Sequence, residues 1–145
     1  MSQTGSLTAI YLRAGARIPV KSTREAKAIA NVGLEGDHAR GGRRQITVLS
    51  EEGWAAACRE FGREVDPSVR RANLLVRGID LGERIRGELR IGEVVIEVLS
   101  ECRPCELLDQ DGNEGLCASL RADRRAGVSG RIVQGGDLKV GMDVS

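Results

Sequence analysis

The chain has 145 residues, and its 22 Lys and Arg nearly balance 21 Asp and Glu, leaving a formal net charge of +1. That length fits one domain, and a nearly neutral chain lacks the basic excess of a general nucleic-acid binder. No apolar run approaches the roughly 20 residues that span a bilayer, and the N-terminus lacks the pattern of a signal peptide. We therefore expect one cytoplasmic domain over residues 1–145, with no nucleic-acid or membrane partner.

The basic residues are almost all arginine, because Lys21, Lys27 and Lys139 are the only lysines. Arg grips phosphate or carboxylate with a planar fork, whereas Lys is a point charge. A GC-rich genome explains most of this excess, so we look for function only in local clusters of arginine. The scarcity of lysine leaves few candidates for a Schiff base, and we expect no pyridoxal phosphate in this chain.

Two strands and one helix are predicted in the first half. Leu7 to Leu12 and Ile46 to Leu49 are short apolar runs typical of strands. Ser50 is a good N-cap for a helix that Gly62 ends. The apolar stripe of this helix consists of Trp54, Ala57, Cys58 and Phe61.

Strands separated by glycine turns are predicted in the second half. Apolar residues lie on both faces of the segment from Val94 to Leu99, and Leu138 to Val144 alternates strictly, which predicts a half-buried strand. A weaker helix is expected over Glu114 to Arg125. The 19 glycines and the missing long helices indicate a mainly β (α+β) fold. We expect a closed or partly open β-barrel with a few accessory helices.

The cysteines are the first candidates for chemistry. Cys58 and Cys117 fall in apolar surroundings and are expected in the core, whereas Cys102 and Cys105 form a C-R-P-C sequence after a predicted strand. Three hypotheses stay open for this pair: half of a zinc site, a thiol–disulfide redox pair, or one cysteine acting as nucleophile or soft metal ligand. Two buried structural thiols are the remaining alternative.

Cys105 is the better candidate for the nucleophile or ligand. Pro104 fixes its own backbone and keeps Arg103 extended. A helical turn over the following ELLD would bring backbone amides to Cys105 and favour its thiolate, with Arg103 as a nearby cation. Cys102 is then the candidate resolving partner.

Residues 33–44 read GLEGDHARGGRR, a glycine-rich loop with the only acid–histidine cluster. Asp37 and His38 are candidates for polar support, and His38 for a general base acting on Cys105. Three arginines suited to phosphate complete the loop: Arg40, Arg43 and Arg44. An ordinary polar connection is the alternative, because no P-loop or dinucleotide-binding motif accompanies it.

Five segments, taken in order, resemble the MOSC domain, which is named from the C-terminal domain of molybdenum-cofactor sulfurases. They are GLEGDHA (33–39), RRQITVLSEE (43–52), RRANLLVRGIDL (70–81), GELRIGEVVIEVLSECRPCELL (87–108) and GVSGRIVQGGDLKVGMDV (127–144). The resemblance is strongest over residues 30–144. It implies a β-barrel-rich fold, in agreement with the strand pattern.

The resemblance also implies a site for the pyranopterin molybdenum cofactor around Cys105, which would carry sulfur as a persulfide or ligate molybdenum. The R-x-N-L segment of the family falls on Arg71 and Asn73. This implies that Arg71 holds the cofactor phosphate and that Asn73 bonds the pterin or pins a loop. The implied cofactor-binding set is Arg43, Arg44, Arg71, Asn73 and Arg103.

Two departures from the family pattern stand out. Asp37 and His38 are adjacent, where related sequences often have a basic residue between them, and Cys102 is an additional thiol. The pyridoxal-phosphate domain of the full sulfurases does not fit into a chain of this length. Any sulfur would therefore come from a separate donor resembling a cysteine desulfurase.

The leading hypothesis is a cofactor-binding domain that carries or transfers sulfur, with Cys105 and Cys102 as catalytic thiols supported by Asp37 and His38. The first alternative is a molybdenum-dependent reductase of N-hydroxylated compounds with a separate electron-donor protein. A thiol oxidoreductase using the C-x-x-C pair and a binding module without chemistry are the others.

Overall fold

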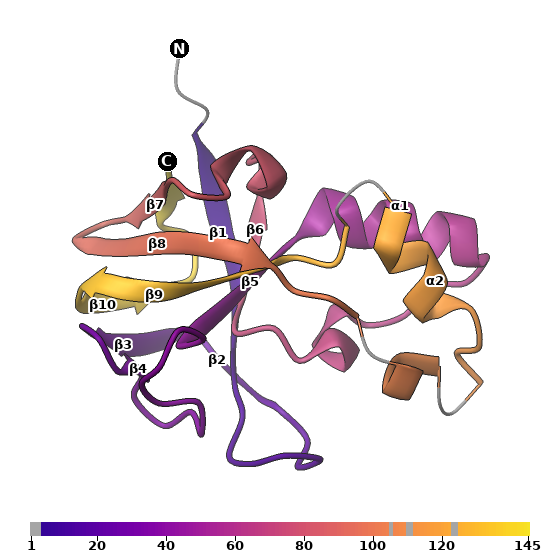
Figure 1. Cartoon of the computed structure of the whole chain (residues 1–145), viewed down its shortest axis with the longest axis horizontal. Coiled ribbons are helices and arrows are strands. Elements are labelled where there is room, and N and C mark those ends of the chain that lie inside the picture. The colour runs from indigo at the N-terminus through magenta and orange to yellow at the C-terminus, as the bar shows by residue number, and fades with distance from the viewer. Residues whose placement is uncertain (1–3, 105, 110–111, 123–124) are drawn as a thin grey trace.

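The computed structural model describes residues 4–104, 106–109, 112–122 and 125–145. The strands lie on one side of the molecule, and helices α1 (Glu51–Phe61) and α2 (Leu116–Arg121) lie on the other (Figure 1). Short 3-10 helices complete the helical elements of the described chain: η1 (Pro67–Arg70), η2 (Leu81–Arg84) and η3 (Glu106–Asp109).

The larger sheet is ring-like. Its strands are β1 (Gly5–Leu12), β2 (Lys21–Thr23), β5 (Ile46–Ser50), β6 (Leu74–Arg77), β7 (Glu88–Ile91), β8 (Val94–Glu101), β9 (Val128–Gln134) and β11 (Asp143–Val144). They follow the order β11-β7-β8-β9-β5-β6-β1-β2, and a further pairing of β11 with β1 closes the strands from β11 to β1 into a ring, with β2 outside the ring beside β1. The predicted mainly β, partly open barrel of short strands is therefore confirmed.

A second sheet has the order β10-β3-β4, with β10 at Gly136–Lys139, β3 at Glu25–Ile29 and β4 at Gly33–Leu34. Within the large ring only β5 and β6 pair in parallel. A parallel pair needs a long crossover connection, and here residues 51–73, with α1 and η1, supply it.

Strands β5 and β6 are apolar on both faces because each face meets a different core. Val48 and Leu74 pack into the core inside the ring of strands. Leu49 and Leu75 point the other way and pack against α1 and α2 in a second core. Side chains alternate across a strand, so this two-sided burial places the helical part directly on the outer surface of β5 and β6.

Helix α1 has the predicted ends and the predicted buried stripe. The Ser50 hydroxyl accepts a hydrogen bond from the Gly53 amide at 3.1 Å, and Gly62 ends the helix in the left-handed conformation. Trp54, Ala57 and Cys58 are buried. Cys117 is buried in the same core, so both cysteines expected in the interior lie there.

Two predicted elements differ from the structure. The alternating segment Leu138 to Val144 is not one strand, because a turn at residues 140–141 divides it between β10 and β11 in different sheets. Gly141 adopts φ 101, which allows the reversal. The helix expected over residues 114–125 is shorter, since α2 spans Leu116–Arg121 and left-handed Gly115 precedes it. In the described chain, no helix is both long and apolar enough to cross a membrane.

Candidate functional site

A cavity of about 200 Å³ lies where β5, the residues before β6 and the end of β8 come together. Its lining consists of Arg13, Arg44, Thr47, Val48, Arg70, Arg71, Ala72, Cys102 and Ala126. Four of these nine side chains are arginines, and none of the nine is acidic. We call this cavity the arginine pocket.

Arg44 and Arg70 both contact Cys102. The Nη2 of Arg44 lies 3.5 Å from the Cys102 Sγ, and the Nη2 of Arg70 donates to the Cys102 carbonyl at 3.0 Å. Arg70 also donates to the Ala126 carbonyl from Nε at 3.1 Å and from Nη2 at 2.9 Å. Cys102 is buried and is a free thiol, so one guanidinium contacts its sulfur and a second holds its backbone.

The residues before β6 present Arg70 and Arg71 to the pocket. Asp66 caps η1, since its carboxylate accepts from the Ser68 amide at 2.9 Å, and this hydrogen bond lowers the pKa of Asp66. Pro67 suits the first turn of η1. Arg71 then reverses the chain in the left-handed conformation, φ 64, before the chain enters β6.

Arg13 is held in the pocket by a buried carboxylate. Its Nε lies 3.2 Å from Oδ1 of Asp37 and its Nη2 lies 3.0 Å from Oδ2. The Arg13 amide donates to the same Oδ1 at 2.7 Å, and the Ala39 amide donates to Oδ2 at 3.1 Å. The Asp37 side chain is fully buried, whereas that of Arg13 is 15% exposed and lines the pocket.

These contacts decide the ionisation of Asp37. Burial raises the pKa of its carboxyl, but the hydrogen bonds from Arg13 and from the Ala39 amide outweigh burial and lower the pKa below its usual value. Asp37 is therefore a carboxylate at neutral pH. Its two oxygens already accept hydrogen bonds from the chain, so it orients Arg13 rather than acting as a proton carrier.

Asn73 connects this ion pair to the strands. Its Oδ1 accepts from the Thr47 amide at 3.1 Å, from the Thr47 hydroxyl at 3.3 Å and from Nη2 of Arg13 at 3.3 Å. Its Nδ2 donates to Oδ1 of Asp37 at 3.1 Å and to the Tyr11 carbonyl at 3.2 Å. Because Asn73 is fully buried, these contacts place it behind the pocket, where it supports Arg13.

The remaining predicted site residues are spread more widely. Arg44 and Arg71 line the pocket with Cys102, but Arg40, Arg43 and His38 are exposed outside its lining. Arg103 lines a different cavity of about 370 Å³ with Glu101, Pro104 and Arg121. Cys102 is not part of the lining of that cavity. Cys105 lies outside the described residues, so its predicted roles as thiolate and metal ligand stay predictions.

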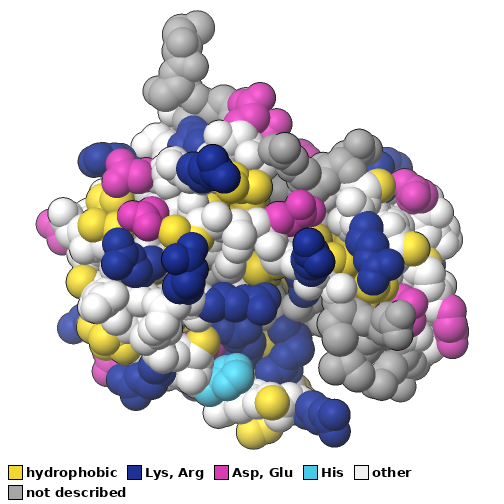
Figure 2. All heavy atoms as spheres, in the orientation of Figure 1, with side chains coloured by type: hydrophobic (Ala, Val, Ile, Leu, Met, Phe, Trp, Pro, Cys, Tyr) yellow, Lys and Arg dark blue, Asp and Glu magenta, His cyan; other side chains and the backbone are white. Residues whose placement is uncertain are grey.

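Arg13 and Arg70 are the site residues that the sequence analysis missed. Arg13 directly follows the predicted first strand, and Arg70 directly precedes the R-x-N-L segment. Neither stands in a motif of its own, and the pocket joins positions 13, 44, 70 and 102 through tertiary contacts alone. Figure 2 shows the result on the surface, where dark-blue Lys and Arg side chains gather near the middle of this face beside the histidine.

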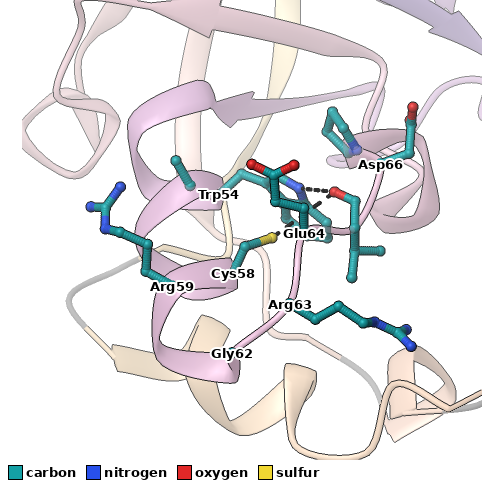
Figure 3. A pocket seen from close by; sticks show the side chains of 10 residues that line it. Trp54, Cys58, Arg59, Gly62, Arg63, Glu64 and Asp66 are labelled. Atoms are coloured by element: carbon teal, nitrogen blue, oxygen red, sulfur yellow. Dashed lines mark hydrogen bonds between the residues drawn. The ribbon is translucent and has the colours of Figure 1, made fainter.

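A larger cavity, of about 820 Å³, lies elsewhere, between α1 and the segment that follows it (Figure 3). Its charges are mixed, with Arg59 and Arg63 opposed by Glu64 and Asp66. The indole N–H of Trp54, which lines this cavity, already donates a hydrogen bond to the Val65 carbonyl at 2.8 Å. Cavity volume alone therefore does not identify the functional site. We choose the arginine pocket because four arginines and a thiol lie together in its lining.

The donor set of the arginine pocket suits an anion that approaches a soft metal or sulfur. Guanidinium groups bind phosphate and carboxylate oxygens, and a thiol is a ligand for soft metals. The volume of about 200 Å³ is below the roughly 300–1,000 Å³ typical of whole small-molecule sites. The pocket therefore fits the anionic end of a larger ligand. The described residues include no group of three or more His, Cys, Asp or Glu arranged to hold a metal.

Fold and site together define a small, mainly β domain with an arginine-lined pocket beside a cysteine. The chain belongs to the MOSC domain family, whose model matches residues 35–145. This family is associated with binding of the molybdenum cofactor. Arg13 lies outside the matched range, so the lining of the pocket includes a residue that directly follows β1 and precedes the matched segment.

Solved structures share the fold along nearly the whole chain. The YuaD protein from Bacillus subtilis has a TM-score of 0.80 at 18% identity, over 97% of this chain and 94% of that one. YiiM from Escherichia coli has a TM-score of 0.71 at 20% identity, over 97% and 68% of the two chains. YiiM from Geobacillus stearothermophilus has a TM-score of 0.75 at 14% identity, over 97% and 73%. No curated protein matches the sequence significantly. At these identities the likeness establishes the fold.

Proposed function

We propose that the protein binds the pyranopterin molybdenum cofactor with its arginine pocket and carries sulfur on a cysteine of the C-R-P-C segment. The observation that supports this most directly is the group of four arginines around the Cys102 thiol. Family membership supplies the class of cofactor, and the charge of the pocket supplies a reason for an anionic ligand to bind there.

The arginines would hold the anionic end of the cofactor. Arg44 has the greatest freedom to do so, because the Cys102 sulfur is its only hydrogen-bond partner in the described chain. Arg13 is already oriented by Asp37, and Arg70 by the carbonyls of Cys102 and Ala126. Groups that are fixed before binding lose less entropy on binding. Arg71 adds a fourth positive charge to the lining.

The cysteines would supply the sulfur chemistry. When bound, the cofactor provides a molybdenum centre that accepts a thiolate or sulfide ligand. In the proposed carriage step, the Cys105 thiolate attacks the terminal sulfur of a persulfide on a separate donor protein. A new sulfur–sulfur bond forms, the donor bond breaks, and the donor cysteine leaves as a thiolate. Among the described cysteines, Cys102 is the one that lines the pocket and contacts Arg44, where the anion would bind.

The test is expression in a host that makes the molybdenum cofactor, followed by measurement of molybdenum and pterin per chain. We expect the wild type to retain both and Arg44→Gln to lose about tenfold in pterin, equivalent to about 1.4 kcal/mol of binding. Arg131→Gln is the matched control, because the Arg131 side chain is exposed on β9 and pairs with Glu97. Absence of pterin from the wild type would overturn the cofactor assignment.

Two cysteine variants separate the thiol roles. Cys105→Ser should retain pterin and lose transferable sulfur, measured as cyanide-labile sulfur after incubation with a persulfide donor. Cys102→Ser should retain the persulfide. Full persulfide loading of Cys105→Ser would exclude Cys105 as the carrier. A disulfide that titrates at a defined potential in a pterin-free wild type would instead identify a redox pair.

A further inference from the structure

Arg71 is tied to the segment between β1 and β2 through both its backbone and its side chain. Its Nη2 donates to the Gly15 carbonyl at 2.8 Å, and its Nη1 donates to the Ile18 carbonyl. Its own carbonyl accepts from Nη1 of Arg13 at 3.4 Å. One residue of the pocket lining therefore holds three positions within residues 13–18.

The loop of residues 14–19 has few other restraints. Within the loop, the Ile18 amide donates to the Gly15 carbonyl at 3.4 Å. Among the residues that the structure describes, Arg71 provides the only hydrogen bonds that reach residues 14–19 from outside the loop. All of its residues except Gly15 are exposed, and Arg17 adopts φ 64. The Arg71 guanidinium therefore supplies the hydrogen bonds that tie this loop to the rest of the described chain.

We propose that Arg71 is a positioning residue that couples the loop of residues 14–19 to anion binding in the arginine pocket. This inference rests on the proposed anion-binding function of the pocket. An anion bound beside Arg13 and Arg71 restricts both side chains; Arg71 holds the loop directly, and Arg13 donates to the Arg71 carbonyl. Coupling between two sites is reciprocal, so an ordered loop in turn favours the binding-ready position of Arg13.

Limited trypsin digestion tests the coupling, with inorganic phosphate as the probe and chloride at matched ionic strength as the reference. Arg17 is an exposed cleavage site inside the loop, and Arg86, exposed in the turn before β7, is the internal control. We expect saturating phosphate to slow cleavage after Arg17 about fivefold and to leave cleavage after Arg86 unchanged. In Arg71→Gln, cleavage after Arg17 should be fast with and without phosphate.

Two further variants exclude an effect of charge alone. Arg71→Lys keeps the positive charge but replaces the two terminal nitrogens of the fork with one, so it should lose most of the phosphate protection. Protection equal to that of wild type in Arg71→Lys would overturn the positioning role. Pro19→Gly loosens the loop without changing the pocket lining, and we expect it to weaken phosphate binding about threefold by calorimetry.

The outcomes distinguish this inference from the proposed function. If wild-type protein binds phosphate but its cleavage after Arg17 does not change, anion binding by the pocket is supported and the coupling is wrong. If Pro19→Gly binds phosphate as tightly as the wild type, the reciprocal effect is absent and the coupling is again wrong. If the wild type binds no phosphate, the anion pocket fails, and the coupling fails with it.

Discussion

The carboxylate of Asp37 fixes the guanidinium of Arg13 from behind, with Nε–Oδ1 and Nη2–Oδ2 distances of 3.2 and 3.0 Å. The carboxylate is fully buried, while the guanidinium keeps partial access to the pocket. The positive charge of Arg13, which faces the arginine pocket, is thus anchored to the negative charge of Asp37, which faces the interior. The pair therefore contributes both to the stability of the fold and to the shape of the site.

Asp37→Asn should destabilise the protein by about 2–4 kcal/mol, because it leaves Arg13 beside the core without a counter-charge. The effect falls toward the lower part of the range for buried pairs, since Arg13 is partly exposed. Urea unfolding measures it. Glu88→Gln is the control, because Glu88 pairs with Arg90 on the surface, and less than about 1 kcal/mol is expected there. Equal costs for the two variants would show that the buried pair adds nothing.

Acid should unfold the wild type more steeply than Asp37→Asn. The pKa of Asp37 is lower in the folded chain than in the unfolded one, so the unfolded chain binds more protons as the pH falls. The stabilisation is complete above the ordinary carboxyl pKa of about 3.9 and is lost as the pH falls toward the folded pKa. Asp66, whose pKa is also lowered, acts in the same direction.

The measurement is the free energy of unfolding between pH 6 and pH 2, in both proteins. The stability difference between wild type and Asp37→Asn should shrink as the pH falls below about 4. A difference that stays constant across this range would contradict the charged state assigned to Asp37.

Cys102 should prefer anionic thiol reagents relative to the other buried cysteines. Four arginines line its pocket and raise the local concentration of anions. Cys58 lines the cavity of about 820 Å³ beside α1, where charges are mixed. We expect the ratio of iodoacetate to iodoacetamide alkylation rates to be about fivefold higher at Cys102 than at Cys58 in low salt, measured by mass spectrometry.

Salt and one substitution check the electrostatic origin of this preference. Added salt screens the attraction, and Arg44→Gln removes the guanidinium nearest to the Cys102 sulfur. Both changes should bring the rate ratio of Cys102 toward that of Cys58. A ratio that responds to neither would rule out steering of reagents by the pocket.

Gly127→Ala should be more destabilising than Gly141→Ala. Both glycines have positive φ, 93 and 101, so both variants bear the cost of the left-handed conformation, about 1–2 kcal/mol. A Cβ at Gly127 would lie 2.6 Å from the Val48 carbonyl oxygen, whereas one at Gly141 meets nothing within 4 Å. Thermal and urea unfolding should show an additional loss of about 1–3 kcal/mol for Gly127→Ala.

The same substitution should alter the pocket. The Gly127 carbonyl accepts the Cys102 amide at 2.8 Å, and its neighbour Ala126 lines the cavity. A shift away from Val48 would move Cys102, so the alkylation rate of Cys102 should change in Gly127→Ala and stay constant in Gly141→Ala. Equal stability losses in the two variants would contradict the close approach of Gly127 to β5.

Local patterns were sufficient to predict β1, β5 and α1. Helix α1, for example, has its Ser50 cap, its apolar stripe and its Gly62 end within a single stretch of sequence. The division of residues 138–144 between two sheets was not predictable from alternation, because both halves continue the same pattern and only tertiary pairing separates them.

The site was predicted in part for a similar reason. The glycine-rich loop brought Arg44 into consideration, the C-R-P-C pair brought Cys102, and the family resemblance brought Arg71 and Asn73. Arg13 could not be predicted as a site residue from the sequence, because its partner Asp37 is 24 positions away and only the fold brings the two together. Sequence also gave no sign that Arg103 and Cys102 face different cavities, since that depends on how the end of β8 lies against its neighbours.

The apolar residues that line the arginine pocket come from both hydrophobic cores. Val48 belongs to the core inside the ring of strands, whereas Ala72 and Ala126 belong to the core under the helices. Repacking of either core, even by an apolar substitution far from any ligand, would change the spacing of the arginines. Evolution can therefore tune ligand preference in such a domain through its interior, while every charged residue of the site stays the same.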